Sequence, residues 1–188
     1  MEAVALWPGA GSSAEHPSLV ALEQALAPLP VVRLDFPYRR EGRKAPDRAP
    51  KLLASIHAEV EALCERLGTT PGHVVLGGRS MGGRMCSMAV AGVDGAAPLP
   101  AAGLALVAYP LHPPGQPERL RTEHLPDVRV PTLFISGDRD PFGTPAELAD
   151  ARALVVGPVT SVTVPGARHE LKGAEDVIVA EVRDWLGR

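Results

Sequence analysis

A serine between two glycines is the feature of this chain best suited to covalent chemistry. Residues 78–82, Gly-Arg-Ser-Met-Gly, match the pattern G-x-S-x-G, in which the serine can act as a nucleophile. An apolar stretch leads into the motif, and a run of small residues with helical character follows it. We therefore expect a strand–turn–helix that holds Ser80 at a helix N-terminus, where the helix dipole favours developing negative charge. A purely structural turn, or a glycine-rich turn that binds phosphate, is the alternative interpretation.

An acid and a histidine follow Ser80 in the order that this motif requires. A serine is a weak nucleophile unless a base removes its proton and a third group orients that base. Asp138 and Asp140 come just after the fifth candidate strand, and His169 comes just after the sixth. We predict a triad of Ser80, Asp140 and His169, with Asp140 preferred to Asp138 because it ends a Gly-x-x-Asp turn. A turn-stabilising aspartate and an ordinary surface or core histidine are the alternatives.

Two backbone N–H groups are expected to stabilise the oxyanion that forms when the serine attacks a carbonyl group. One is that of Met81, which directly follows the nucleophile. The other should come from the loop at residues 8–13, Pro-Gly-Ala-Gly-Ser-Ser, after the first candidate strand. We predict Ala10 as this donor, because the glycines on both sides let the backbone come close to a substrate.

The same loop also fits a fingerprint for binding dinucleotides. Residues 9–14 read G-x-G-x-x-A, and Asp35 lies roughly where a ribose-binding carboxylate belongs. However, the next helix is expected to begin only at Pro17, so the glycines would not form its first turn. This interpretation also leaves the three triad candidates unexplained, and it is therefore the less favoured one.

Alternating apolar stretches and helical periodicity predict a parallel sheet covered by helices, an α/β class of fold. Continuous apolar character suggests strands that are buried on both faces. The six candidate strands are residues 4–7, 31–35, 74–77, 104–109, 132–136 and 161–164. The candidate helices begin at Pro17, cover residues 52–67 up to Gly68, and continue at residues 81–90, 146–154 and 175–186.

Composition limits the classes of protein to which the chain can belong. Its 188 residues fit one domain, residues 1–188, and 45% hydrophobic with 22% charged residues is the balance of a soluble globular protein. A net charge of -3 gives no reason to expect nucleic acid or a membrane as a partner. The six histidines show no metal-ligand spacing and the two cysteines read as buried free thiols, so we expect neither a metal nor a disulfide. Without a basic leader or a long apolar run, the expected location is the cytoplasm. The oligomeric state stays open.

Two long segments interrupt the alternation of strands and helices. Residues 38–51 are basic and contain proline, and residues 112–131 are rich in proline and charge. Loops of this length in a compact domain are often functional, so we expect substrate contacts there. We predict Tyr38 and Arg79 as substrate-binding residues, the latter toward a substrate acid. The alternatives are a solvated loop for residues 38–51 and a bracing role for Arg79.

Three motifs resemble a small α/β-hydrolase family related to dienelactone hydrolases. They are Gly-Gly-Arg-Ser-Met-Gly-Gly-Arg at 77–84, the early Pro-Gly-Ala-Gly loop with His16-Pro17, and Leu-Asp-Phe-Pro-Tyr at 34–38. This family also contains a branch resembling a subunit of a chromatin acetyltransferase complex. The resemblance covers nearly the whole chain, and it implies an α/β-hydrolase fold with the triad predicted above. One departure is Pro8, where such hydrolases commonly have a histidine.

The sequence thus favours a serine hydrolase of small esters or thioesters that uses an acyl-enzyme intermediate, has no lid domain and needs no cofactor. The alternative from a different class is a non-catalytic domain of the same fold that binds a protein partner, since a fold and a motif do not guarantee turnover.

Overall fold

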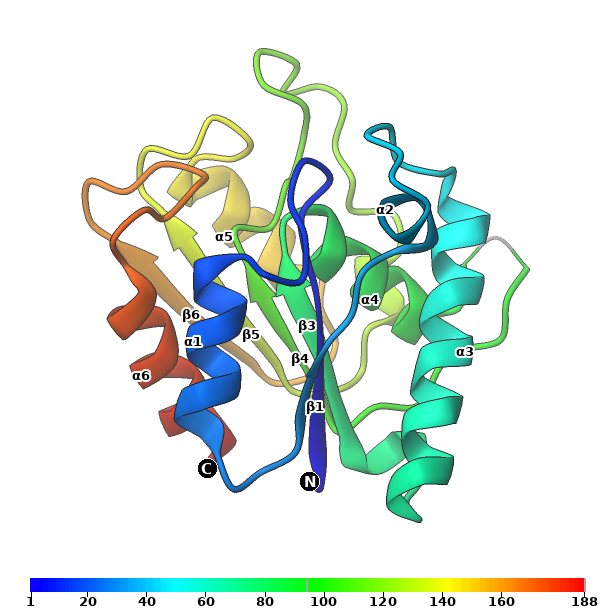
Figure 1. Cartoon of the computed structure of the whole chain (residues 1–188). Helices are drawn as coiled ribbons and strands as arrows, with labels where there is room; N and C mark the ends of the chain where they lie inside the picture. Colours follow the sequence, from blue (N-terminus) through cyan, green and yellow to red (C-terminus); the bar gives the residue numbers. More distant parts are fainter. Residues whose placement is uncertain (94, 188) are drawn as a thin grey trace.

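The computed structural model describes residues 1–93 and 95–187. Its centre is a sheet of six strands, all parallel, in the order β2-β1-β3-β4-β5-β6 (Figure 1). The strands are β1 (Ala3–Trp7), β2 (Val31–Arg33), β3 (Val74–Arg79), β4 (Gly103–Val107), β5 (Thr132–Gly137) and β6 (Val159–Val164). The six predicted strands and their parallel arrangement are therefore confirmed.

Helices cover both faces of this sheet. They are α1 (Pro17–Leu26), α2 (Pro37–Arg40), α3 (Ala49–Leu67), α4 (Met81–Ala91), α5 (Pro145–Ala153) and α6 (Glu175–Leu186), with short 3-10 turns η1 (Pro71–His73) and η2 (Leu125–Asp127). Helices α1 and α6 pack together on one face, and α3 and α4 pack on the other (Figure 1). The described residues contain no inserted lid domain, as expected.

The apolar periodicity of α3 shows why these helices form. Leu52, Ile56, Val60 and Leu63 lie on one stripe and are all buried against the sheet. Burying a side chain of this kind contributes about 1.5–3 kcal/mol relative to leaving it in water. The helix ends at Gly68, whose φ of 66° is the left-handed conformation that favours glycine.

Some expected boundaries were wrong. Residues 38–51 are not one loop, because α2 begins at Pro37 and α3 already begins at Ala49. Strand β4 ends at Val107 rather than at residue 109, because Ala108 leaves the extended conformation with a φ of 52°. The two edge strands are also less buried than continuous apolar runs suggested. Strand β6 alternates between exposed and partly exposed residues over most of its length, because an edge strand has a neighbour on one side only.

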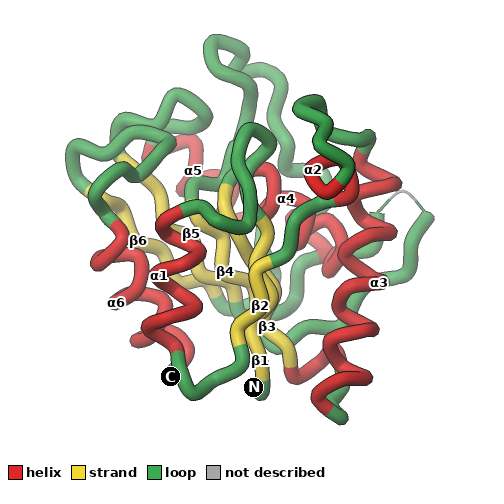
Figure 2. The backbone as a smooth tube through the Cα atoms, in the orientation of Figure 1, coloured by secondary structure: helices red, strands yellow, loops and turns green. Residues whose placement is uncertain are grey.

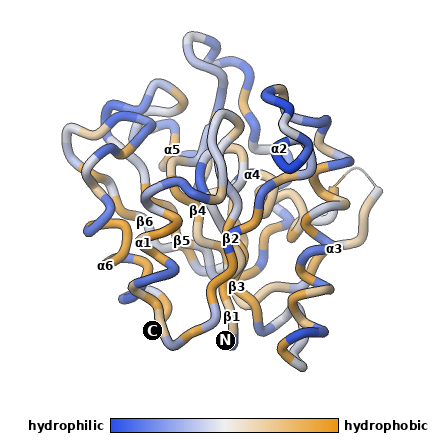
Figure 3. The backbone as a smooth tube through the Cα atoms, in the orientation of Figure 1, coloured by the Kyte–Doolittle hydropathy of each residue, from blue (hydrophilic) through white to orange (hydrophobic). Residues whose placement is uncertain are grey.

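The loops that follow the strands gather at one edge of the sheet. All six strands are parallel, so their carboxyl ends lie on the same side, and the loops form a layer above them (Figure 2). This layer is largely hydrophilic, whereas the strands below it are largely hydrophobic (Figure 3). Sites in parallel α/β sheets form at this edge, and both chain termini lie at the opposite end (Figure 1).

Candidate active site

Ser80 lies in a tight turn between β3 and α4. Its backbone angles, φ 48° and ψ -118°, are strained for a residue with a side chain, and it occupies the N-cap position of α4. The glycines of the motif make this turn possible: a Cβ on Gly78 would lie 2.0 Å from the Trp7 carbonyl oxygen, and one on Gly82 would lie 2.3 Å from it. The motif therefore needs glycine at both positions because the end of β1 lies directly against the turn.

His169 and Asp140 reach Ser80 from two other loops at the same edge of the sheet. The Ser80 hydroxyl lies 2.9 Å from His169 Nε2, and His169 Nδ1 lies 2.8 Å from Asp140 Oδ2. With Asp140 ionised, Nδ1 carries the proton and donates it to the carboxylate, so Nε2 can accept from the serine hydroxyl. The three predicted residues thus form one continuous chain of hydrogen bonds.

The Asp140 carboxylate is held from two sides. Its Oδ1 accepts a hydrogen bond of 2.8 Å from the Phe142 backbone N–H, while Oδ2 faces the histidine. Asp140 is buried, whereas Asp138 is exposed to solvent. The Phe142 ring stacks on the imidazole of His169, with ring centroids 4.0 Å apart. The turn after β5 therefore orients the imidazole through both its carboxylate and its aromatic ring, and Asp138 takes no part in this arrangement.

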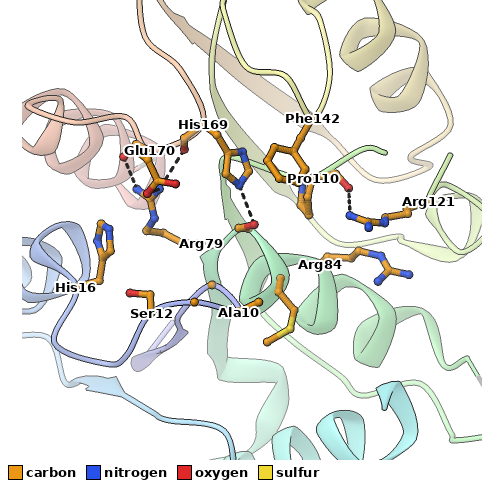
Figure 4. A pocket seen from close by; sticks show the side chains of 14 residues that line it. Ala10, Ser12, His16, Arg79, Arg84, Pro110, Arg121, Phe142, His169 and Glu170 are labelled. Atoms are coloured by element: carbon orange, nitrogen blue, oxygen red, sulfur yellow. Dashed lines mark hydrogen bonds and ion pairs between the residues drawn. The ribbon is translucent and has the colours of Figure 1, made fainter. Parts of the chain in front are cut away.

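Ser80 and His169 open into a pocket of about 680 Å³ (Figure 4). The two predicted oxyanion donors, Met81 and Ala10, line the same pocket. Tyr38 lies outside its lining: this side chain is fully buried, and its hydroxyl donates a 2.8 Å hydrogen bond to the Ala10 carbonyl oxygen. It thus contacts the loop that carries Ala10 instead of facing the pocket.

Arg79 lines the pocket, but its guanidinium already donates hydrogen bonds to backbone carbonyl oxygens of the protein. Its Nη2 donates to the carbonyl oxygen of His169 and its Nη1 to that of Glu170, both at 3.0 Å. The Glu170 carboxylate lies 3.7 Å from Nη2. Burial lowers the pKa of Arg79, and the charge of Glu170 opposes this effect. These contacts correspond to the bracing role that the sequence left open for Arg79.

A family model described as an alpha/beta hydrolase domain matches residues 1–178. The chain belongs to this alpha/beta hydrolase family. Solved structures with the same fold include the dienelactone hydrolase from Anabaena variabilis ATCC 29413, with a TM-score of 0.76 and 21% identity over 100% of this chain and 86% of that chain. The expected alpha/beta hydrolase family is therefore confirmed, and the dienelactone hydrolase shares its fold.

Two further structures extend the comparison. The type II thioesterase BorB from the borrelidin biosynthetic cluster has a TM-score of 0.70 and 22% identity, over 100% of this chain and 92% of that chain. An alpha-beta serine hydrolase homologue from Coxiella burnetii has a TM-score of 0.72 and 18% identity, over 97% and 86% of the two chains. At these identities the likeness establishes the fold, which is the α/β-hydrolase fold predicted from the motifs.

The second long segment contributes to the pocket of this alpha/beta hydrolase, and the first does not. Arg121, from residues 112–131, lines the pocket, but none of residues 38–51 does. Three basic residues of the first segment are instead paired with acids: Arg40 with Glu59, and Arg43 and Lys51 each with Glu41 and Asp47. This arrangement matches the interpretation of residues 38–51 as a solvated segment.

The sequence alone did not point to several residues that line the pocket of this hydrolase. The most polar of them are His16, Arg84, Arg121 and Glu170. Burial, and then the charge of Arg79, lower the pKa of His16, which also caps α1 by accepting from the Ser18 N–H. Arg84 stands within the motif at 77–84, and Arg121 within a segment flagged by its length, but no spacing rule brings the two together.

The loop at residues 9–14 is shaped by Asp35. The Asp35 carboxylate accepts a 2.8 Å hydrogen bond from the Ala14 N–H, and helix α1 begins only at Pro17. Asp35 is therefore engaged with the loop backbone, and the glycines precede the helix, as expected. Among residues 1–93 and 95–187, no group of three or more potential ligands could hold a metal ion, and no helix could span a membrane.

Proposed function

We propose that this protein is a serine hydrolase that cleaves a small ester or thioester through an acyl-enzyme intermediate. The observation that carries the proposal is the chain of hydrogen bonds from Ser80 through His169 to Asp140, at 2.9 and 2.8 Å. This chain begins at Ser80, a serine held in a strained turn that lines a pocket. Nucleophile, base and orienting acid within hydrogen-bond reach are the arrangement that activates a serine.

In the first half-reaction, the Ser80 Oγ attacks the carbonyl carbon of the substrate. The hydroxyl proton passes to His169 Nε2, and Asp140 stabilises the imidazolium through its bond to Nδ1. The tetrahedral intermediate then collapses, and the bond to the alcohol or thiol leaving group breaks. The leaving group takes the proton from Nε2, and the acyl group stays on Ser80 as an ester.

In the second half-reaction, water replaces the leaving group. The water gives a proton to His169 Nε2 as its oxygen attacks the acyl carbon. Collapse of this intermediate breaks the bond to Ser80 Oγ, which recovers the proton from Nε2. The net change is the addition of one water molecule across the ester or thioester bond, which releases a carboxylic acid, and the enzyme needs no cofactor.

Two backbone N–H groups stabilise the negative charge that develops on the carbonyl oxygen of the substrate in both steps. Met81 offers its N–H at the first turn of α4, and Ala10 offers its own from the loop after β1. The Tyr38 hydroxyl holds that loop through the Ala10 carbonyl oxygen. Removing one such donor typically costs about 10²–10³ in kcat.

Hydrolysis of short-chain 4-nitrophenyl esters and acyl thioesters by the wild type and Ser80→Ala tests this proposal. Rapid acid quench followed by mass spectrometry should show an acyl group on Ser80 in the wild type and none in the variant. A folded wild-type protein that neither hydrolyses these compounds nor becomes acylated would contradict the proposal, and would instead favour a domain that binds a partner. A melting temperature raised by NAD or NADP would favour the dinucleotide-binding interpretation.

A further inference from the structure

The pocket carries positive charge unevenly around the reacting serine. On one side, Arg79 is accompanied by the Glu170 carboxylate and by two backbone carbonyl acceptors. The other side holds Arg84 and Arg121, which lie near each other in the close view (Figure 4). Across residues 1–93 and 95–187, no ion pair joins either of these two guanidinium groups to a carboxylate, so neither charge is neutralised by a direct partner.

Arg84 lies close to the reacting centre along α4. Met81 is the first residue of this helix and Arg84 stands three positions later, about 4.5 Å further along the helix axis. Residues three apart lie on the same face of a helix, so the Arg84 side chain lies on the same face as that of Met81, and both residues line the pocket. Its Nε atom is buried and has no hydrogen-bond partner in the protein.

Arg121 reaches the same side of the pocket from the segment between β4 and β5. Its Nη1 donates a hydrogen bond of 3.2 Å to the Pro110 carbonyl oxygen, which leaves its other N–H groups available. Burial, and then the positive charge of Arg84, lower the pKa of Arg121. The two cations therefore repel each other, and an anion bound between them would relieve that repulsion.

A buried polar cluster fixes the backbone at the two arginines. The Ser87 hydroxyl donates to the Arg84 carbonyl oxygen at 2.8 Å, and it accepts from His124 Nε2 at 2.8 Å because its one proton is already used. The Tyr109 hydroxyl donates to the Arg121 carbonyl oxygen at 2.7 Å. These bonds tie α4 to the segment that carries Arg121, so the backbone positions from which the two side chains extend are fixed before binding.

We propose that Arg84 and Arg121 form an oxyanion-binding subsite, so that the preferred substrate is an ester or thioester with a carboxylate or phosphate group a few bonds from the scissile carbonyl. This inference rests on the proposed hydrolase function. Guanidinium groups suit this role because their planar arrays of donors match carboxylate and phosphate oxygens. The apolar side chains of Pro110 and Phe142 line the same pocket, and apolar surroundings strengthen the attraction between opposite charges.

Kinetics on matched substrates test the subsite. The mono-4-nitrophenyl ester of glutaric acid places a carboxylate on the acyl side, 4-carboxyphenyl butyrate places it on the leaving group, and 4-nitrophenyl and phenyl butyrate are the neutral references. We expect Arg84→Gln and Arg121→Gln each to lower the ratio of kcat/KM for a charged ester to that for its neutral reference by about 10- to 100-fold. The ester that shows the drop identifies the side that the subsite serves.

Arg129→Gln is the matched control, because it removes the same charge from an exposed position of the same segment, outside the pocket. This control should leave the ratio within about twofold of the wild type, since exposed charges are screened by salt. If Arg84→Gln and Arg121→Gln also leave the ratio unchanged for both charged esters, the subsite is refuted.

A binding measurement separates failure of the subsite from failure of the hydrolase function. In Ser80→Ala, monomethyl glutarate or methyl 4-phosphonobutanoate should raise the melting temperature more than neutral dimethyl glutarate does. Adding Arg84→Gln or Arg121→Gln should abolish the difference, and the two charged ligands distinguish a carboxylate site from a phosphate site. Equal shifts from charged and neutral ligands would overturn the subsite, whether or not the wild type hydrolyses any ester.

Discussion

The Arg79 guanidinium donates from Nη2 to the carbonyl oxygen of His169 at 3.0 Å, which joins the residue before the serine to the backbone of the histidine. A second bond of the same length runs from Nη1 to the Glu170 carbonyl oxygen. Arg79 is only 3% exposed, so the two bonds are shielded from competing water. The turn after β3 and the loop after β6 are therefore held at a fixed separation by one side chain.

Replacing Arg79 should weaken catalysis through the position of His169. In Arg79→Gln the shorter, neutral side chain cannot span to both carbonyl oxygens, and a misplacement of the base by about 1 Å can cost roughly 100-fold in rate. We expect kcat to fall by about 10- to 100-fold while KM changes by less than about threefold. Steady-state kinetics on a neutral ester measure this split. An increase in KM at unchanged kcat would instead indicate direct contact of Arg79 with the substrate.

Substitution of the two candidate acids should have very different effects. Asp140→Asn keeps the shape of the side chain but no longer stabilises the Nδ1-protonated imidazole, and the matching change in serine proteases lowers kcat by about 10⁴-fold. Asp138→Asn should leave kcat within about twofold, because Asp138 is exposed and makes no bond to the histidine. Comparable losses in the two variants would contradict the assignment of Asp140.

The Tyr38 hydroxyl should influence the oxyanion loop without touching substrate. Tyr38→Phe removes only the hydrogen bond to the Ala10 carbonyl oxygen and leaves the ring in its buried position. We expect a loss of about 1 kcal/mol in the free energy of unfolding. A modest decrease in kcat should accompany it, because the Ala10 N–H is less firmly placed. Chemical denaturation and ester hydrolysis check the two effects, and unchanged values for both would show that this bond has no role.

The buried His124 should make the protein sensitive to acid. Burial, and then the charge of Arg84, lower the pKa of His124 to about 4, below its ordinary value of 6.5. Between these two pKa values, His124 is protonated in the unfolded state but neutral in the folded state. The free energy of unfolding therefore falls as the pH drops from about 6.5 to about 4. The loss across this range is about 3 kcal/mol.

Urea denaturation at pH 7 and at pH 4.5 measures this dependence. His124→Gln keeps a side-chain N–H that can donate to Ser87 but does not titrate. It should be less stable than the wild type at pH 7, and its stability should decrease less between the two pH values. An equal decrease in both proteins would assign the acid sensitivity to other groups.

Local patterns in the sequence predicted most of the fold. The strands and the longer helices follow from apolar runs and from periodicity, as in the stripe of α3 that ends at Gly68. Boundaries were missed where a single residue leaves the regular conformation, as at Ala108, and where four residues form the short helix α2. Such features are set by the packing of neighbouring elements, and a short window of sequence does not contain this information.

Part of the candidate site could likewise be predicted from the sequence, and part of it could not. The order of Ser80, Asp140 and His169 along the chain follows from the motif, because the carboxyl ends of parallel strands meet at one edge. The pairing of Arg84 and Arg121 in one pocket could not be predicted, since Arg84 belongs to a helix and Arg121 to an irregular segment, and only the folded chain brings them together. Likewise, nothing in the sequence near Tyr38 indicates that its hydroxyl reaches Ala10.

Labelling with a fluorophosphonate most directly tests whether Ser80 is an activated nucleophile. The reagent forms a covalent bond with a serine that has a working base, and mass spectrometry of the digested protein locates the adduct. We predict one adduct on Ser80 of the wild type, none in Ser80→Ala, and strongly slowed labelling in a folded His169→Ala variant. A folded wild-type protein that remains unlabelled, or that carries the adduct on a different residue, would contradict the proposed triad.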